Sequence, residues 1–177
     1  MSPTPSKKIK KIHIIINPAS GRIEPILPII NTVLTEAGID WDVFVTKKPH
    51  DATKHAKESI KNKVDALAIY GGDGTVMEVI SGMIHSEIPL VILPGGTANV
   101  LATELNISKD LKMACQLICG SHHVRTIDVA QFNKSYFILR MGLGFEAEMV
   151  NGANRDIKNR FGRLAYVLSS LKALREI

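Results

Sequence analysis

The chain has 177 residues, of which 45% are hydrophobic, 22% charged and 5% aromatic. These fractions are ordinary for a globular protein, and they exclude a disordered chain, a collagen-like chain and a disulfide scaffold. The formal net charge of +5 favours anionic partners such as phosphate groups, nucleic acid or acidic lipid surfaces, without selecting among them.

The N-terminal residues and the two cysteines both indicate a cytoplasmic protein. Residues 1–10 are rich in Ser, Pro and Lys and are predicted to be a disordered basic tail. No apolar signal-peptide segment follows, and no apolar run reaches the roughly 20 residues that a membrane span needs. Cys115 and Cys119 lie four residues apart in an expected helix, where we expect buried apolar side chains and no disulfide or zinc site.

Short β-rich runs alternate with helical ones from residue 12 onward. The run 12–16 is isoleucine at every position except His13, as in a strand that is buried on both faces of a parallel sheet. In chain order the expected elements are strand 12–16, helix 26–37 ended by Gly38, strand 41–46, helix 50–62 with Asp51 as N-cap, strand 65–70, a helix with an apolar stripe over 76–84, strand 90–93, a short helix 100–105, and a helix capped by Ser108 and ended by Gly120.

This alternation predicts an α/β fold, with a mostly parallel sheet and helices on both faces. After residue 121 the pattern changes to strands 124–130 and 136–141 around a hairpin turn at 132–135, followed by a basic helix from Phe161. One hairpin and one helix cannot enclose a core of their own. We therefore expect an α/β domain over 11–124 and the beginning of a second, β-rich domain over 125–177, truncated at Ile177.

Three expected strands each end in a small polar loop that contains glycine. The first loop is 17–21 (Asn-Pro-Ala-Ser-Gly), the second is 71–75 (Gly-Gly-Asp-Gly-Thr) and the third is 94–99 (Pro-Gly-Gly-Thr-Ala-Asn). Parallel strands end at one edge of a sheet, so the three loops can converge there. Glycine lets the backbone approach a ligand closely, and helix N-termini attract anions. The pattern predicts a phosphate-binding crevice.

Asp73 is the acidic residue of the second loop. Phosphate repels a carboxylate at this place unless a cation bridges the two, or unless the carboxylate handles the proton of the phosphate acceptor. The alternative is a turn residue whose side chain holds the loop. Neither the Walker A motif nor the dinucleotide-binding Gly-x-Gly-x-x-Gly motif is present in the sequence.

At these residues the chain resembles the catalytic domain of diacylglycerol kinases, a family with bacterial soluble lipid kinases and the sphingosine and ceramide kinases. The Gly-Gly-Asp-Gly core alone is shared with NAD kinases and phosphofructokinases, so the specificity lies in the three loops together. The resemblance covers residues 10–177 and is carried by the first loop (Asn-Pro-x-Ser-Gly), the second loop with Glu78 after it, the segment 93–99 (Pro-x-Gly-Thr-x-Asn), Asp128, the pair Tyr136 and Phe137, and Gly142-x-Gly144-Phe145.

The resemblance implies ATP-dependent phosphorylation of a lipid hydroxyl, with ATP and Mg²⁺ as cofactors and Asp73 as a catalytic residue near the phosphates. It leaves the metal ligands unassigned and implies that the general base lies in a later part of the second domain. The ATP-binding residues that it implies are Asn17, Pro18, Ala19, Ser20, Gly21, Thr46, Gly71, Gly72, Asp73, Gly74, Thr75, Glu78, Gly96, Thr97 and Asn99.

Two alternatives stay open at this point. A NAD kinase-like enzyme would share the aspartate loop, and a non-catalytic nucleotide-binding or scaffold fragment would explain why the helical pattern still runs at Ile177. The expected partner is a diacylglycerol-like lipid with a free hydroxyl, and a homodimer is a further option. The basic residues between 155 and 163 either form the charged outer face of a helix that packs on the core or contact an anionic inner-membrane surface. Nucleic acid is not expected, because the few aromatic residues do not alternate with basic ones.

Overall fold

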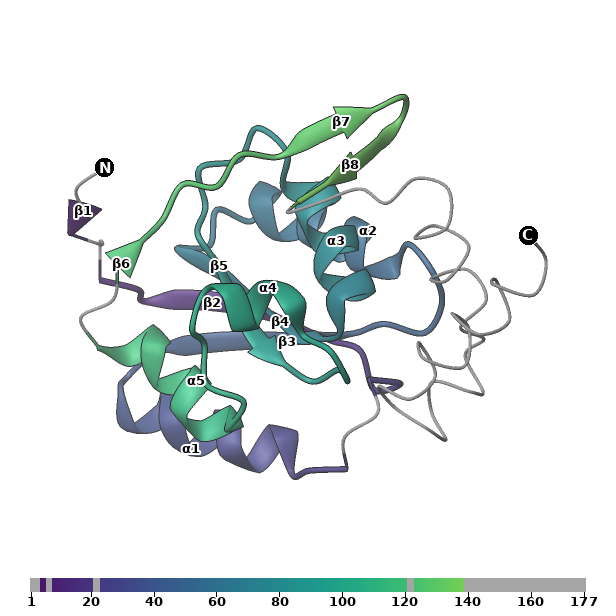
Figure 1. Ribbon diagram of the computed structural model, residues 1–177. Helices are drawn as coiled ribbons and strands as arrows, with labels where there is room; N and C mark the ends of the chain where they lie inside the picture. Colours follow the sequence, from purple (N-terminus) through teal and green to yellow (C-terminus); the bar gives the residue numbers. More distant parts are fainter. Residues whose placement is uncertain (1–3, 6–7, 21–22, 121–122, 139–177) are drawn as a thin grey trace. The chain divides into compact units, whose positions relative to one another are not determined.

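The computed structural model describes residues 4–5, 8–20, 23–120 and 123–138 (Figure 1). The chain divides into two compact units, Met1–Tyr136 and Phe137–Ile177. The boundary expected after residue 124 therefore falls inside the first unit. The strand expected to reach 141, the motif at 142–145, the basic residues of 155–163 and the helix from Phe161 lie outside the described residues, so the second domain stays a prediction.

Four parallel strands form the central sheet of the first unit. They are β2 (Lys11–Ile16), β3 (Asp40–Val45), β4 (Ala66–Gly71) and β5 (Leu90–Pro94), in the spatial order β3-β2-β4-β5. Ile14 of β2 lies opposite Val43 of β3 on one side and Ala68 of β4 on the other. The chain thus turns to opposite sides after β2 and after β3, which makes the β2–β4 junction the topological switch point of the sheet.

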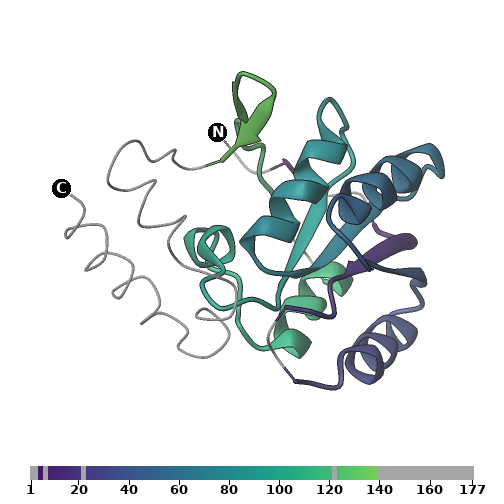
Figure 2. The same ribbon diagram turned by 90° about the vertical axis from the view of Figure 1, so that its right-hand side faces the viewer.

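Two helices cover each face of this sheet, as Figures 1 and 2 show. Helices α1 (Ile26–Glu36) and α5 (Leu111–Cys119) pack together on one face, and α2 (Asp51–Lys61) and α3 (Asp73–Met83) on the other. The short helix α4 (Val100–Glu104) follows β5. The predicted α/β fold with helices on both faces is confirmed.

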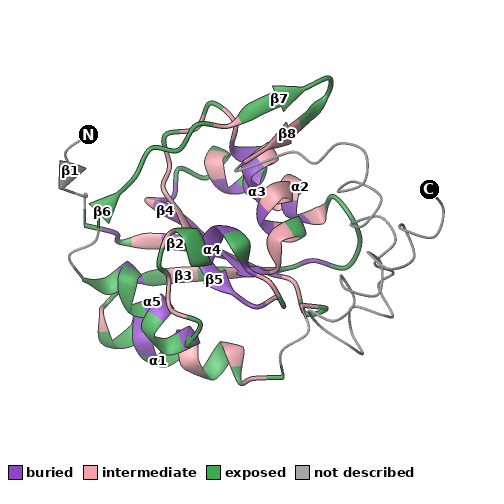
Figure 3. Ribbon diagram, in the orientation of Figure 1, coloured by how far each residue is buried: buried purple, intermediate pink, exposed green. Residues whose placement is uncertain are grey.

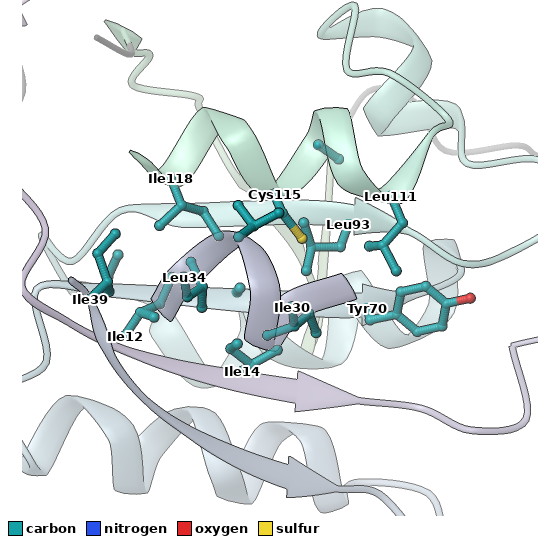
Figure 4. Close-up of a cluster of buried hydrophobic side chains, with 14 of the residues drawn as sticks. Ile12, Ile14, Ile30, Leu34, Ile39, Tyr70, Leu93, Leu111, Cys115 and Ile118 are labelled. Atoms are coloured by element: carbon teal, nitrogen blue, oxygen red, sulfur yellow. The ribbon is translucent and has the colours of Figure 1, made fainter. Parts of the chain in front are cut away.

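Burial explains the sequence pattern of the strands. Every residue of β4 and all but the first residue of β2 are buried, because these two central strands are covered on both faces (Figure 3). A hydrophobic core lies between the sheet and the layer formed by α1 and α5 (Figure 4). Cys115 belongs to it, and burial raises the pKa of its thiol to about 12. Cys119 is exposed, which corrects the expectation that both cysteines are buried.

Two helix N-caps differ from those expected. The N-cap of α2 is His50, whose φ is 70°, and Asp51 is the first helical residue. The Asp51 carboxylate accepts the N–H groups of Lys47 and Lys48 at 2.9 and 3.0 Å, and these bonds lower its pKa. The N-cap of α5 is Asp110, whose side chain accepts the Met113 N–H at 2.9 Å. Both carboxylates therefore accept backbone N–H groups near a helix start, but the N-cap residue is not the expected one in either helix.

The two ends of the first unit also correct the expectations. Part of the expected tail is ordered, because β1 (Thr4–Pro5) pairs antiparallel with β6 (His123–Val124) and Ile9 is buried in the core. Strands β7 (Ala130–Phe132) and β8 (Ser135–Phe137) form the predicted hairpin, but the strand expected over 124–130 is interrupted, because residues 125–129 belong to no strand and 125–128 are exposed. Within the described residues, none of the helices has the length and apolar character that crossing a bilayer requires.

His13 is a buried histidine in the middle of the sheet, away from the three loops. Its Nδ1 lies 2.9 Å from Ser59 Oγ on α2, and its Nε2 lies 3.3 Å from Asp42 Oδ2 on β3. Burial lowers the pKa of His13 below 6.5, and the neighbouring Lys11 acts in the same direction, whereas the carboxylates of Asp42 and Glu58 oppose it.

We expect His13 to make the free energy of unfolding depend on pH. Its folded pKa is below that of the unfolded chain, so the unfolded chain takes up the proton first as the pH falls. The stabilisation that neutral His13 contributes is complete above about pH 6.5 and declines as the pH drops from there toward the folded pKa. Urea unfolding between pH 7.5 and 5 should show a steeper loss for the wild type than for His13→Gln. Parallel curves for the two proteins would contradict the assignment.

Candidate functional site

The first and second loops contact each other at the switch point of the sheet. The backbone N–H of Asn17, which follows β2, donates to the carbonyl of Tyr70 in β4 at 2.9 Å. The side-chain Nδ2 of Asn17 donates to Thr75 Oγ1 at 2.7 Å. These two bonds join the ends of neighbouring strands, so the first loop begins directly beside the second.

The second and third loops also meet. The Gly95 N–H donates to the Gly71 carbonyl at 3.0 Å, and Asp73 Oδ1 accepts the Val100 N–H at 2.7 Å. The backbones touch at Gly96, where a Cβ would lie 2.5 Å from the Cα of Gly72. Only glycine fits there without moving one loop. The three loops therefore converge at the carboxyl edge of the sheet, as the sequence predicts.

The second loop has two backbone N–H groups that have no hydrogen-bond partner among the described residues. Gly72 is the N-cap of α3, and the N–H groups of Thr75 and Val76 both donate to its carbonyl at 3.0 Å. The N–H groups of Asp73 and Gly74 belong to the first turn, where no helical carbonyl precedes them. Together with the partial positive charge of the helix N-terminus, these donors suit an anion.

The first loop, by contrast, uses its donors internally. The Ala19 N–H donates to Asn17 Oδ1 at 3.0 Å, and the Ser20 N–H donates to the Asn17 carbonyl at 3.2 Å. The Ser20 hydroxyl donates to the same carbonyl at 2.7 Å. The N–H groups of Ala19 and Ser20 are therefore occupied within the loop, while Gly21 lies outside the described residues.

Asn99 organises the third loop from inside. Its φ is 50°, its side chain is buried, and its Oδ1 and Nδ2 bind the Gly96 N–H and carbonyl at 2.9 and 2.7 Å. Both ends of the amide are thus occupied by the loop itself. Thr97, between these two residues, is exposed at the tip of the loop. The geometry favours Thr97 as a ligand contact and Asn99 as the residue that holds the loop.

The charged and hydroxyl residues around the loops lie at different depths. Asp73 is partly exposed, and one of its oxygens is engaged with Val100. Glu78 is half-buried one turn further along α3. Thr46 is buried at the end of β3, where its N–H donates to the Ile16 carbonyl at 2.9 Å. Thr46 is therefore at the same sheet edge, beside the start of the first loop. In the described part of the chain, no three His, Cys, Asp or Glu side chains are grouped to hold a metal by themselves.

Comparison with known proteins decides the family. The model of the diacylglycerol kinase catalytic domain matches residues 11–132. The chain belongs to this diacylglycerol kinase family. The matched residues include all three loops and all four strands of the sheet.

Individual relatives and solved structures of this family support the assignment. The diacylglycerol kinase of Bacillus subtilis (strain 168) is 34% identical over 172 residues, which are 94% of this chain and 56% of that protein. An uncharacterized protein of Synechocystis sp. is 34% identical over 182 residues, covering 96% of this chain and 42% of that one. A diacylglycerol kinase structure from Bacillus anthracis str. Sterne matches with a TM-score of 0.66 and 36% identity, covering 75% of this chain and 51% of that chain. The chain spans about half the length of the relatives it matches.

Sequence reasoning missed two residues, Tyr70 and Glu24, that the fold places at the loops. The Tyr70 hydroxyl donates to Glu24 Oε1 at 2.6 Å, between the end of β4 and the segment that leads into α1. Tyr70 ends an apolar run, so the pattern marks it only as a core residue. A usable signal was present, because a buried tyrosine generally needs a hydrogen-bond partner for its hydroxyl.

Proposed function

We propose that this chain is the nucleotide-binding part of an ATP-dependent lipid kinase, which transfers the γ-phosphate of ATP to the hydroxyl of a diacylglycerol-like lipid. The observation that carries the proposal is the contact of all three glycine-bearing loops at the switch point, around the start of α3. Phosphoryl transfer depends mainly on positioning and on neutralising charge, and a crevice of backbone donors supplies both. Membership of the diacylglycerol kinase family supports the lipid acceptor.

The proposed contacts with ATP differ in kind from loop to loop. The N–H groups of Asp73 and Gly74 would bind phosphate oxygens, and the exposed hydroxyl of Thr97 faces solvent from the opposite loop. The first loop would contribute mainly through its shape, because its described N–H groups are taken by Asn17. Thr46 and Glu78 are proposed as outer contacts of the nucleotide. In this proposal the second loop is the main phosphate-binding element.

The residues of the site fit a Mg²⁺ ion that is shared with the phosphates. Mg²⁺ usually keeps several waters and is held by one or two carboxylates together with substrate phosphates, so a cluster of three protein ligands is not required. Asp73 has one oxygen on the Val100 N–H, and its second oxygen has no hydrogen-bond partner among the described residues. Asp73 would therefore hold Mg²⁺ through that second oxygen. When bound, Mg²⁺ neutralises charge on the transferred phosphate.

Calorimetric titration of ATP into the 177-residue chain tests the nucleotide part of this proposal. We expect Mg²⁺-dependent binding that is lost in Gly72→Arg, whose side chain would fill the space between the second and third loops. A parallel titration with NAD serves as the control for a NAD kinase-like site. A folded wild-type chain that binds no ATP would contradict the proposal and favour a scaffold role, and selective binding of NAD would favour the NAD kinase alternative.

Incubation with γ-labelled ATP and dioleoylglycerol in mixed micelles tests the lipid part. Because the chain spans about half of its relatives, the same assay should be made on the longest reading frame that contains it. We expect label in the lipid only when Mg²⁺ is present, and no label with a lipid whose hydroxyl is methylated. ATP binding without transfer to any hydroxylated lipid would contradict the lipid-kinase assignment.

A further inference from the structure

Tyr70 contacts both ends of the segment 17–24, which contains the first loop. Its backbone carbonyl accepts the N–H of Asn17 at 2.9 Å, where the segment begins. Its hydroxyl donates to Glu24 Oε1 at 2.6 Å, where the segment ends. A single residue of β4 therefore binds both ends of this segment, on either side of residues 18–23.

The ring of Tyr70 also supports the third loop. A Cβ on Gly95 would lie 2.7 Å from the ring atoms Cε1 and Cζ, so the backbone of Gly95 rests directly on the ring. The ring itself is 1% exposed and is part of the core under α1 and α5. Figure 4 shows its hydroxyl pointing away from the other labelled core side chains. The same side chain thus contacts the first-loop segment with its hydroxyl and the third loop with its face.

The chemistry of this contact favours a role beyond packing. A phenylalanine would fill the same apolar space, so the core alone does not require a hydroxyl. A hydrogen bond from a hydroxyl to a carboxylate is short and stronger than one between neutral groups. A tyrosine has only two side-chain torsions, both fixed here by packing, so it holds its hydroxyl at a constant distance from β4.

We propose that Tyr70 is a positioning residue that sets the spacing between the first and third loops through its hydrogen bond to Glu24. The role in nucleotide affinity rests on the proposed ATP site, whereas the hold on the segment 17–24 does not. Tyr70 itself need not touch the nucleotide. Loss of the hydroxyl releases the Glu24 end of the segment and leaves the Asn17 end attached.

Three single variants and the double variant of Tyr70→Phe with Glu24→Ala test the proposal. Tyr70→Phe and Glu24→Ala each remove one partner of the bond, and Glu24→Gln keeps an oxygen that can accept it. We expect Tyr70→Phe and Glu24→Ala to speed amide hydrogen exchange in residues 17–24 and to weaken MgATP binding about three- to tenfold. The double variant should be no worse than either single one, and Glu24→Gln should lie between the wild type and Glu24→Ala, because it keeps the bond without its charge. Tyr136→Phe, which removes a hydroxyl outside the three loops, is the matched control.

The two readouts separate failure of this inference from failure of the proposed function. Exchange is measured without ligand, so a wild type that binds no ATP removes the proposed function, while the exchange data still decide whether Tyr70 holds the segment. Unchanged exchange in Tyr70→Phe would overturn the inference. It would also be overturned by additive effects in the double variant, or by a loss in Glu24→Gln as large as in Glu24→Ala. If Tyr70→Phe does not fold, the two Glu24 variants give the same decision.

Discussion

Replacing Asp73 with asparagine is expected to reduce the gain in ATP affinity that Mg²⁺ gives. The Asp73 carboxylate lies at the start of α3, beside the N–H groups proposed for the phosphates. It repels the phosphates when no cation is present. Asparagine removes that charge, so metal-free ATP should bind a few-fold more tightly. With Mg²⁺ the same change removes a ligand of the ion, and affinity should fall about tenfold or more.

The design of this test separates the charge of Asp73 from its structural contact. Asparagine keeps an oxygen that can accept the Val100 N–H, which Asp73 Oδ1 accepts at 2.7 Å, so the thermal unfolding of Asp73→Asn should match the wild type. Asp73→Ala loses the contact as well and should lower the free energy of unfolding by about 1–2 kcal/mol. Calorimetry with Mg²⁺ and with EDTA gives the comparison. An unchanged response of Asp73→Asn to Mg²⁺ would mean that Asp73 only holds the third loop.

Gly96→Ala is expected to separate the second and third loops and to weaken MgATP binding at least about tenfold. The added methyl would lie 2.5 Å from the Gly72 Cα and 3.0 Å from Asn99 Oδ1, and the backbone atom cannot rotate away. Overpacking of this kind costs about 1–3 kcal/mol of stability. Urea unfolding and calorimetric titration of the same preparation measure both effects.

Gly74→Ala is the matched control for stability. Nothing lies within 4 Å of a Cβ at Gly74, which is in the first turn of α3. Alanine is favoured over glycine in a helix, so the free energy of unfolding should be unchanged or higher. If Gly96→Ala were as stable as Gly74→Ala and bound MgATP like the wild type, the close approach of the two loops would have no part in the site.

The sheet and the meeting of the loops could be predicted because both follow from local patterns. Residues 12–16 and 65–70 are apolar except for His13 and Asp65, which indicates central parallel strands, and their order in an α/β fold places their carboxyl ends at one edge. Within the first unit the chain confirms these strands with boundaries shifted by about one residue. The same order of strands predicts that the first and second loops meet.

The contacts inside the site could not be predicted, because they join residues whose partners depend on loop conformation. Asp73 binds an N–H that is 27 residues away, and nothing in its own loop indicates Val100. Asn99 belongs to the expected ATP contacts, and in the structure its backbone is left-handed and its side chain binds Gly96. The N–H groups of Ala19 and Ser20 donate to Asn17 in a local turn, which an Asn-Pro start permits but does not require.

The hydrogen bonds that join the three loops have a kinetic consequence. Each loop is already fixed to its neighbour, through Asn17 to Thr75 and through Asp73 to Val100, before any ligand arrives. A site that is assembled in advance loses little conformational freedom when it is filled. ATP association measured by stopped flow should therefore proceed in one phase, with an observed rate that rises linearly with ATP concentration. A rate that levels off at high ATP would instead indicate that the loops rearrange before or after the encounter.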